Sequence, residues 1–276
     1  MLIDATRIRL RADVPVGAYL SGGLDSSTTT AVIRNYTHNR LDTFSIAFAD
    51  AEFDESAFQK QMARFLGTDH HVVTCTHEDI GRIFPEVIWH TETPILRTSP
   101  APMYLLSRLV RDHGFKVVIT GEGADEFLAG YDIFKEMKIR RFWAKQPQSQ
   151  MRPLLLRTLY PDIERVSRSG DAFLAAFFGK GLSDTASPFY SHMLRGANTA
   201  RARRFLAVDA HPLEDHIGQI PLPAAFARWS HLGQAQYLEV TTFLSQYLLS
   251  SQGDRPAMAH SVEGRFPFLD YRVIEF

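Results

Sequence analysis

The stretch Leu20-Ser21-Gly22-Gly23-Leu24-Asp25-Ser26-Ser27 decides the fold, because it joins an apolar run typical of a buried strand to the start of a helix. Two adjacent glycines let the backbone approach an anion closely, and amides at a helix start carry the positive end of the helix dipole. The serines add hydroxyl donors. Asp25 would repel a phosphate unless Mg2+ lay between them. The stretch therefore predicts a loop that binds a nucleotide together with a metal ion.

This loop does not match the common nucleotide-binding motifs. A Walker A loop needs a lysine after its last glycine, and the dinucleotide fingerprint needs three glycines in the spacing G-x-G-x-x-G. The loop instead resembles the pyrophosphate loop (PP-loop), S-G-G-x-D-S-S, of the N-type ATP pyrophosphatases, which cleave ATP between the α and β phosphates. The alternative is a glycine-rich turn with an ordinary helix cap, which two glycines alone would favour.

The composition fits one large domain or two modest ones, with 276 residues of which 45% are hydrophobic and 22% are charged. A formal net charge of -1 gives no long-range attraction to nucleic acid or to an anionic membrane. Cys75 is the only cysteine, which excludes an internal disulfide, and we expect it in a strand rather than as a nucleophile. The sequence contains neither an apolar run of about 20 residues nor a signal peptide. We expect a cytoplasmic protein without nucleic-acid or membrane partners.

The first half of the chain alternates short apolar runs with amphipathic stretches, as a parallel sheet covered by helices requires. We expect strands at 15–20, 43–48, 70–74 and 116–120, and helices at 26–35, 55–66, 79–90 and 103–113. From Ile133 onward the chain reads as helical. The predicted fold class is therefore α/β: a single domain in which a nucleotide-binding core, 1–132, is followed by a mainly helical part, 133–276, that completes the cleft.

A second loop with unusual residues follows the strand expected at 116–120. Its sequence, Thr120-Gly121-Glu122-Gly123-Ala124-Asp125-Glu126, contains three carboxylates. Acidic side chains beside a triphosphate suit Mg2+ coordination or proton transfer, whereas the alternative is acidic capping of a helix that starts near Asp125. Ligands gather at the carboxyl ends of parallel strands, so the loops after Leu20 and Thr120 should share one cleft. That pairing favours chemistry.

Three segments of the helical part can be assigned to secondary structure from their sequence patterns. Between Phe134 and Trp143, aromatic and basic residues alternate with the spacing of a helix that has a core stripe and a solvated basic face. A helix at 238–249, ended by Gly253, should deliver Arg255 toward the cleft. The stretch 196–223 is expected to be a long loop.

Two other groups of residues contain side chains that often bind ligands, and only the second is a candidate here. His70 and His71 are adjacent on an expected strand, so they point to opposite faces and are unsuited to share one metal ion. Arg97, in the proline-rich stretch 92–102, could pair with a substrate carboxylate.

Four phrases resemble the synthetase domain of glutamine-hydrolysing asparagine synthetases, in that family's order. They are VPVGAYLSGGLDSS at 14–27, FSIAF at 44–48, TGEGADE at 120–126 and VEGRFPFLD at 262–270. The resemblance implies a PP-loop fold of the adenine nucleotide α-hydrolase type and an AMP-forming ligase that uses ATP and Mg2+. In that family the β-carboxylate of aspartate attacks the α-phosphate of MgATP, and ammonia then displaces AMP to give asparagine.

The resemblance also implies roles for particular residues. The implied nucleotide-binding residues are Leu20, Ser21, Gly22, Gly23, Asp25, Ser26, Ile46, Thr120 and Gly121. Asp25 and Asp125 would flank Mg2+, and the backbone of Ile46 would hydrogen-bond the adenine edge. Glu122 matches the acid/base residue that takes a proton from the attacking ammonium. Arg255 stands where many members carry a phosphate-binding lysine; it keeps the charge but differs in shape, and an interhelical salt bridge is its alternative role.

The ends of the chain differ from the family pattern. Members usually begin with a domain whose amino-terminal cysteine hydrolyses glutamine, and they continue into further helices after the segment matched by 270–276. We expect a synthetase domain that is truncated at both ends and uses ammonia, either free or supplied by a glutaminase domain or subunit.

Three alternatives to an asparagine synthase remain open. The same adenylating chemistry could act on another carboxylate, as in β-lactam synthetases or in amidotransferases of peptides and surface glycans. The chain could instead be a silent binding or regulatory module, or an inactive fragment that only binds nucleotide.

Overall fold

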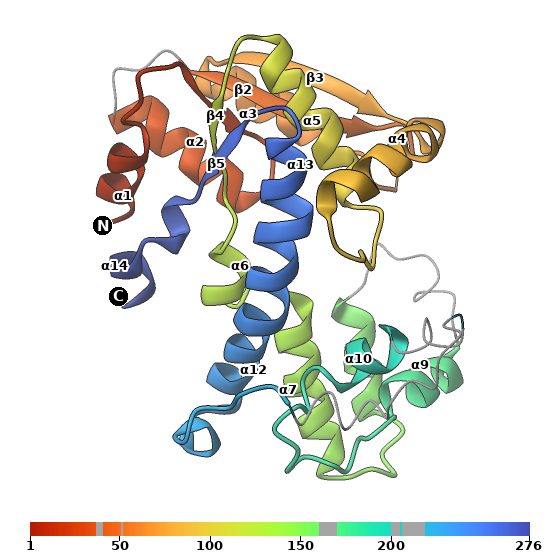
Figure 1. Cartoon of the computed structure of the whole chain (residues 1–276). Helices are drawn as coiled ribbons and strands as arrows, with labels where there is room; N and C mark the ends of the chain where they lie inside the picture. Colours follow the sequence, from red (N-terminus) through yellow and green to blue (C-terminus); the bar gives the residue numbers. More distant parts are fainter. Residues whose placement is uncertain (37–40, 51, 160–169, 200–204, 206–218) are drawn as a thin grey trace. The chain divides into compact units, whose positions relative to one another are not determined.

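The computed structural model describes residues 1–36, 41–50, 52–159, 170–199, 205 and 219–276. These residues form two compact units, Met1–Phe127 together with Thr242–Phe276, and Leu128–Thr241 (Figure 1). The predicted boundary lies after Asp132, whereas the first unit ends at Phe127. The end of the chain, from Thr242 to Phe276, belongs to the first unit and not to the helical part.

A five-stranded parallel sheet forms the centre of the first unit, in the order β3-β2-β1-β4-β5 (Figure 1). The strands are β1 (Val16–Tyr19), β2 (Asp42–Phe48), β3 (Asp69–Cys75), β4 (Val117–Ile119) and β5 (Glu263–Arg265). The predicted α/β class is confirmed, and four strands lie where the sequence predicts them. The part after Ile133 is mainly helical, as predicted, but it also contains β5, which the sequence analysis missed and which returns from the end of the chain to pair with β4.

Helices cover both faces of this sheet. They are α1 (Leu2–Arg9), α2 (Leu24–Tyr36), α3 (Ser56–Leu66), α4 (His77–Thr91), α5 (Pro100–Asp112), α6 (Ala124–Phe127), α13 (Arg255–Met258), η5 (Pro267–Leu269) and α14 (Tyr271–Ile274). One core cluster joins Ala18 and Ile119 to Ile33 of α2. Another joins Phe44 and Val118 to Val110 of α5. The sheet is thus buried on both faces, as parallel sheets usually are.

The second unit is helical in the residues described. Its elements are α7 (Asp132–Ala144), η1 (Arg152–Leu159), α9 (Asp171–Phe178), α10 (Met193–Thr199), η3 (Phe226–Arg228) and α12 (His231–Glu239). The helix predicted around 134–143 is confirmed, and Phe134, Met137 and Trp143 form its buried stripe, but its basic face is not wholly solvated, because Arg140 is buried. The loop expected at 196–223 lies largely outside the described residues, and its first residues belong to α10.

Arg140 lies fully buried in the second unit, where its guanidinium donates to three main-chain oxygens. It donates to the carbonyls of Phe178, Lys180 and Tyr190. Three hydrogen bonds and a ring contact 4.6 Å from the Tyr190 centroid satisfy a charge that would otherwise be costly to bury.

The helix expected at 238–249 differs from the structure. After α12 ends at Glu239, the π-helical segment η4 (Val240–Asp254) continues through Gly253, so Gly253 does not end the helix. A Cβ at Gly253 would lie 2.7 Å from the carbonyl oxygen of Leu248, so the wide turn requires a glycine there. No helix among the described residues is long and apolar enough to cross a membrane.

Candidate active site

The PP-loop lies between β1 and α2 and is braced by its own serines. Ser21 and Ser26 place their hydroxyl oxygens 2.9 Å apart, and the Gly23 amide donates to Ser21 Oγ at 3.2 Å. Leu20, which is fully buried, fixes the start of the loop: its amide donates to the Phe44 carbonyl, and its own carbonyl accepts from Ser45 Oγ. The loop therefore has a defined conformation while Ser21 and Gly23 stay exposed.

Gly22 adopts a conformation that only glycine takes easily, with φ of 87°. A Cβ there would also lie 2.7 Å from Phe58 Cβ and 2.8 Å from the Gln59 nitrogen, at the start of α3. The first of the two glycines is thus required by the packing of the loop against α3.

The acidic loop, Thr120–Glu126, packs directly against the PP-loop. A Cβ on Gly121 would lie 3.0 Å from Asp25 Cβ and 3.1 Å from the Ser26 nitrogen. This contact confirms the prediction that the loops after Leu20 and Thr120 meet at the carboxyl edge of the sheet. It also explains why position 121 requires a glycine: the backbones of the two loops approach too closely for a side chain to fit between them.

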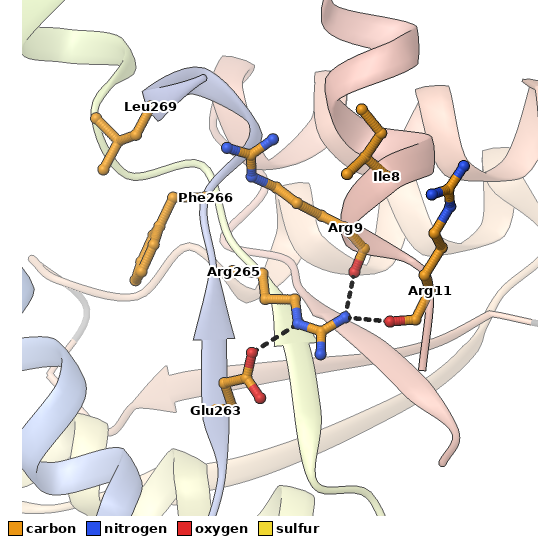
Figure 2. A pocket seen from close by; sticks show the side chains of 7 residues that line it. All are labelled: Ile8, Arg9, Arg11, Glu263, Arg265, Phe266 and Leu269. Carbon is orange, nitrogen blue, oxygen red and sulfur yellow. Dashed lines mark hydrogen bonds and ion pairs between the residues drawn. The ribbon is translucent and has the colours of Figure 1, made fainter. Parts of the chain in front are cut away.

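The acidic loop is supported from behind by β5. The Thr120 amide donates to the carbonyl of Arg265 at 2.9 Å, and a Cβ on Gly123 would lie 2.2 Å from Leu269 Cδ2. Figure 2 shows how Arg265 is held: its Nη1 donates to the carbonyls of Arg9 and Arg11, and its Nε pairs with Glu263. The VEGRFPFLD phrase therefore supports the acidic loop.

Four carboxylates influence one another at the junction of the two loops. Burial, and after it the negative charges of Glu126, Asp125 and Asp25, together raise the pKa of Glu122 to about 7. Burial also raises the pKa of Asp125, with a contribution from Asp25, and burial raises the pKa of Asp25 itself. A cation placed among these groups would stabilise their ionised forms.

The residues at this junction fit a Mg2+ ion that is coordinated partly by carboxylates of the protein and partly by phosphate oxygens of a bound ligand. Among the described residues, no set of three or more histidine, cysteine or acidic side chains forms a metal cluster. Mg2+ commonly binds one or two carboxylates and completes its octahedron with phosphate oxygens and water. Asp25 and Asp125 would supply the two carboxylates, and a divalent ion would relieve both the burial of these charges and the repulsion that Asp25 exerts on Asp125.

A cavity of about 480 Å3 opens beside the carboxyl ends of β2 and β3. Ile46 lines it, and this size suits a small molecule. Residues that the sequence analysis missed, Phe53, Met103 and Gln252, form other walls. The rule that ligands gather at strand ends could have identified Phe53, but Gln252 reaches this cavity only through tertiary folding.

The main-chain oxygen of Ile46 already accepts one hydrogen bond from the protein. Gln59, which is 2% exposed, donates from Nε2 to that oxygen at 2.9 Å, while Gln59 Oε1 is buried without a hydrogen-bond partner among the described residues. A carbonyl oxygen has two lone pairs and can therefore accept a second hydrogen bond.

Arg255 forms an ion pair within the first unit. Its Nη1 donates to the Thr91 carbonyl and lies 3.0 Å from Glu92 Oε2, at the end of α4. The structure thus contains a salt bridge, which the sequence analysis gave as the alternative role of Arg255. Arg255 is nevertheless close in sequence to Gln252, which lines the cavity. Arg97 lies 5.1 Å from the centroid of the Phe243 ring.

The two neighbouring histidines make separate contacts, as predicted. His70 Nδ1 is 3.0 Å from Thr43 Oγ1, and His71 Nε2 is 3.0 Å from Asp42 Oδ1. Cys75 is buried at the end of β3, where a strand residue was expected.

Comparison with known families agrees with the site. The family described as asparagine synthase matches residues 1–276. The chain belongs to the asparagine synthase family.

The relatives of this asparagine synthase family member carry two kinds of name. It is 30% identical to the amidase chyE of Penicillium rubens and 28% identical to the amidase chry2 of Gibberella zeae, over 100% of this chain and 44% of each relative. It is 26% identical to the glutamine-hydrolysing asparagine synthetase 1 of Bacillus subtilis, over 99% of this chain and 42% of the relative. The chain spans less than half the length of these relatives.

Proposed function

We propose that this chain activates a carboxylate with MgATP and transfers an amine to it, forming an amide with release of AMP and pyrophosphate. Family membership supports ATP-dependent amidation. The observation that carries the proposal is the contact of Gly121 with Asp25 and Ser26, which brings an anion-binding loop and an acidic loop to one place.

In the first step, a carboxylate oxygen attacks the α-phosphorus of ATP. A new oxygen–phosphorus bond forms, the bond to the bridging oxygen of the β-phosphate breaks, and pyrophosphate leaves. The amides and hydroxyls of Ser21 to Ser26 would hold the leaving pyrophosphate, and Thr120 and Gly121 would lie beside the α-phosphate. Mg2+, when bound by Asp25 and Asp125, would neutralise charge on the phosphates.

In the second step, a neutral amine attacks the carbonyl carbon of the acyl adenylate, and AMP leaves. Ammonium has no lone pair, so a proton must be removed before or during attack. Glu122 suits this task because its pKa of about 7 lies near neutral pH, where a carboxylate can both accept and return a proton. The role of Glu122 is thus to hold the proton that the nucleophile loses.

We further propose aspartate as the carboxylate and ammonia as the amine, giving asparagine. The relatives named asparagine synthetases favour this choice. The relatives named amidases favour a different carboxylate processed by the same two steps. Arg255 would bind a phosphate of the nucleotide if its ion pair with Glu92 opened. A glutaminase domain or subunit would be one source of ammonia.

The test is release of AMP and pyrophosphate from MgATP by the purified chain, with a panel of carboxylic acids and ammonium. Mass spectrometry would identify the amide product. Asp125→Asn is the site variant, and Asp132→Asn, an exposed ion-pair residue of α7, is its matched control. Turnover lost in the first variant and kept in the second supports the proposal. A folded chain that turns over no ATP with any acid, or equal turnover in both variants, contradicts it.

A further inference from the structure

The second unit contains a cavity of about 720 Å3 that the amidation chemistry does not use. We propose that this cavity binds a small anion, a phosphate or carboxylate, that carries an aromatic or acyl group. All its lining residues belong to the second unit, and its size lies within the range of about 300–1,000 Å3 typical of small-molecule sites.

One face of α7 supplies the positive charge of this cavity. Lys138, Arg141 and Lys145 all line it, and their spacing of three and then four residues places them along one side of a helix. No acidic residue is among the described residues that line the cavity. Three like charges around one space repel one another, so a bound anion would be stabilised there.

Arg141 provides the most specific indication of a ligand. Its Nη2 donates to the Thr185 carbonyl at 2.9 Å, and its guanidinium carbon lies 5.0 Å from the centroid of the Tyr190 ring. These contacts fix the side chain, yet its Nε is buried and has no acceptor among the described residues. A buried donor without an acceptor is unfavourable, so a small rotation of the guanidinium toward the cavity, where an anionic oxygen would accept from it, would be favoured.

Apart from Thr185 and His231, the remaining walls are apolar, and they specify the other half of the ligand. Phe134 and Met137 are buried, whereas Phe142 and Leu232 leave 43% and 41% of their surfaces exposed. An apolar group in the cavity would cover these exposed side chains and gain the usual hydrophobic free energy. Inorganic phosphate satisfies only the cations, so the cavity favours an amphipathic anion.

The experiment titrates phenyl phosphate into the full chain by isothermal titration calorimetry. Excess α,β-methylene-ATP with Mg2+ is present, so that the proposed nucleotide site does not contribute. We expect saturable binding about tenfold tighter than that of inorganic phosphate, because burial of a phenyl ring exceeds about 1.4 kcal/mol. Benzyl alcohol, which has the ring without the charge, should give no saturable binding.

Three variants locate the binding. Lys138→Gln and Lys145→Gln should each weaken phenyl phosphate binding about fivefold, because each removes a charge-assisted contact. Lys135→Gln should leave it unchanged, since Lys135 lies on the same helix but pairs with Asp132 outside the cavity. The proposal is overturned by absent saturation, by equal affinity for inorganic phosphate, or by equal weakening in the control. Because these variants lie in the second unit, the result does not depend on whether the chain turns over ATP.

Discussion

Gly121→Ala tests the contact between the two loops. The added Cβ would meet Asp25 Cβ at 3.0 Å, and the Asp25 carbonyl carbon and Ser26 nitrogen at 3.1 Å. Contacts below 3.4 Å are tighter than most real ones, so the loops must separate by a few tenths of an ångström. Two of these three atoms are main-chain atoms, which cannot rotate away as a flexible side chain can.

The expected cost has two parts. Overpacking of this kind lowers the free energy of unfolding by about 1–3 kcal/mol. Displacement of the acidic loop from the nucleotide should also lower kcat/KM for ATP about tenfold to hundredfold, because reaction rates depend steeply on the alignment of reacting groups. Urea denaturation and AMP release measure these two effects separately.

Gly81→Ala is the matched control. Gly81 lies within α4, and a Cβ there would meet nothing within 4 Å. Since alanine favours a helix interior, this change should raise the free energy of unfolding by about 0.5–1 kcal/mol and leave turnover unchanged. If Gly121→Ala matched wild type in both stability and turnover, the close approach of the two loops would be wrong.

Three other predictions follow from the buried charges. Asp125→Asn should reduce Mg2+-dependent pyrophosphate release at least about hundredfold, yet raise Tm without Mg2+, because one repelling charge is gone. The pKa of Glu122 is raised from 4.5 to about 7, so its ionisation opposes folding. Stability of the Mg2+-free protein should therefore fall by up to about 3 kcal/mol as pH rises through that range. Glu122→Gln should flatten this decline in urea denaturation performed across pH; an unchanged slope would refute the assignment. Arg140→Leu should lower the free energy of unfolding by about 3 kcal/mol or more, since three carbonyls lose their donor. Lys135→Leu, an exposed change on the same helix, should shift it by less than about 0.5 kcal/mol, and equal effects would contradict the role given to Arg140.

Much of the first unit could be predicted because its signals are local. Apolar runs identify β1 to β4, and glycines next to acidic or hydroxyl residues identify the two loops. The parallel-sheet rule then places both loops at one edge, as the Gly121 contact confirms.

The missed features depend on contacts between distant segments. β5 has the sequence Glu-Gly-Arg, without the alternation that indicates a strand, and it forms only because β4 offers an open edge. Gly253 suggests a helix end, whereas the π-helical segment η4 continues through it, with the Leu248 carbonyl too close for a side chain at that position. The pairing of Arg255 with Glu92 likewise joins two segments that no short-range pattern relates.

The most direct test of the account follows an oxygen atom from the carboxylate. The acid that supports turnover would be labelled with oxygen-18 in its reacting carboxylate and incubated with MgATP, ammonium and the purified chain. Attack on the α-phosphorus followed by amine attack on the carbonyl carbon predicts AMP that carries one oxygen-18 atom, together with unlabelled pyrophosphate. Unlabelled AMP, or ADP and phosphate in place of AMP and pyrophosphate, would contradict the proposed chemistry.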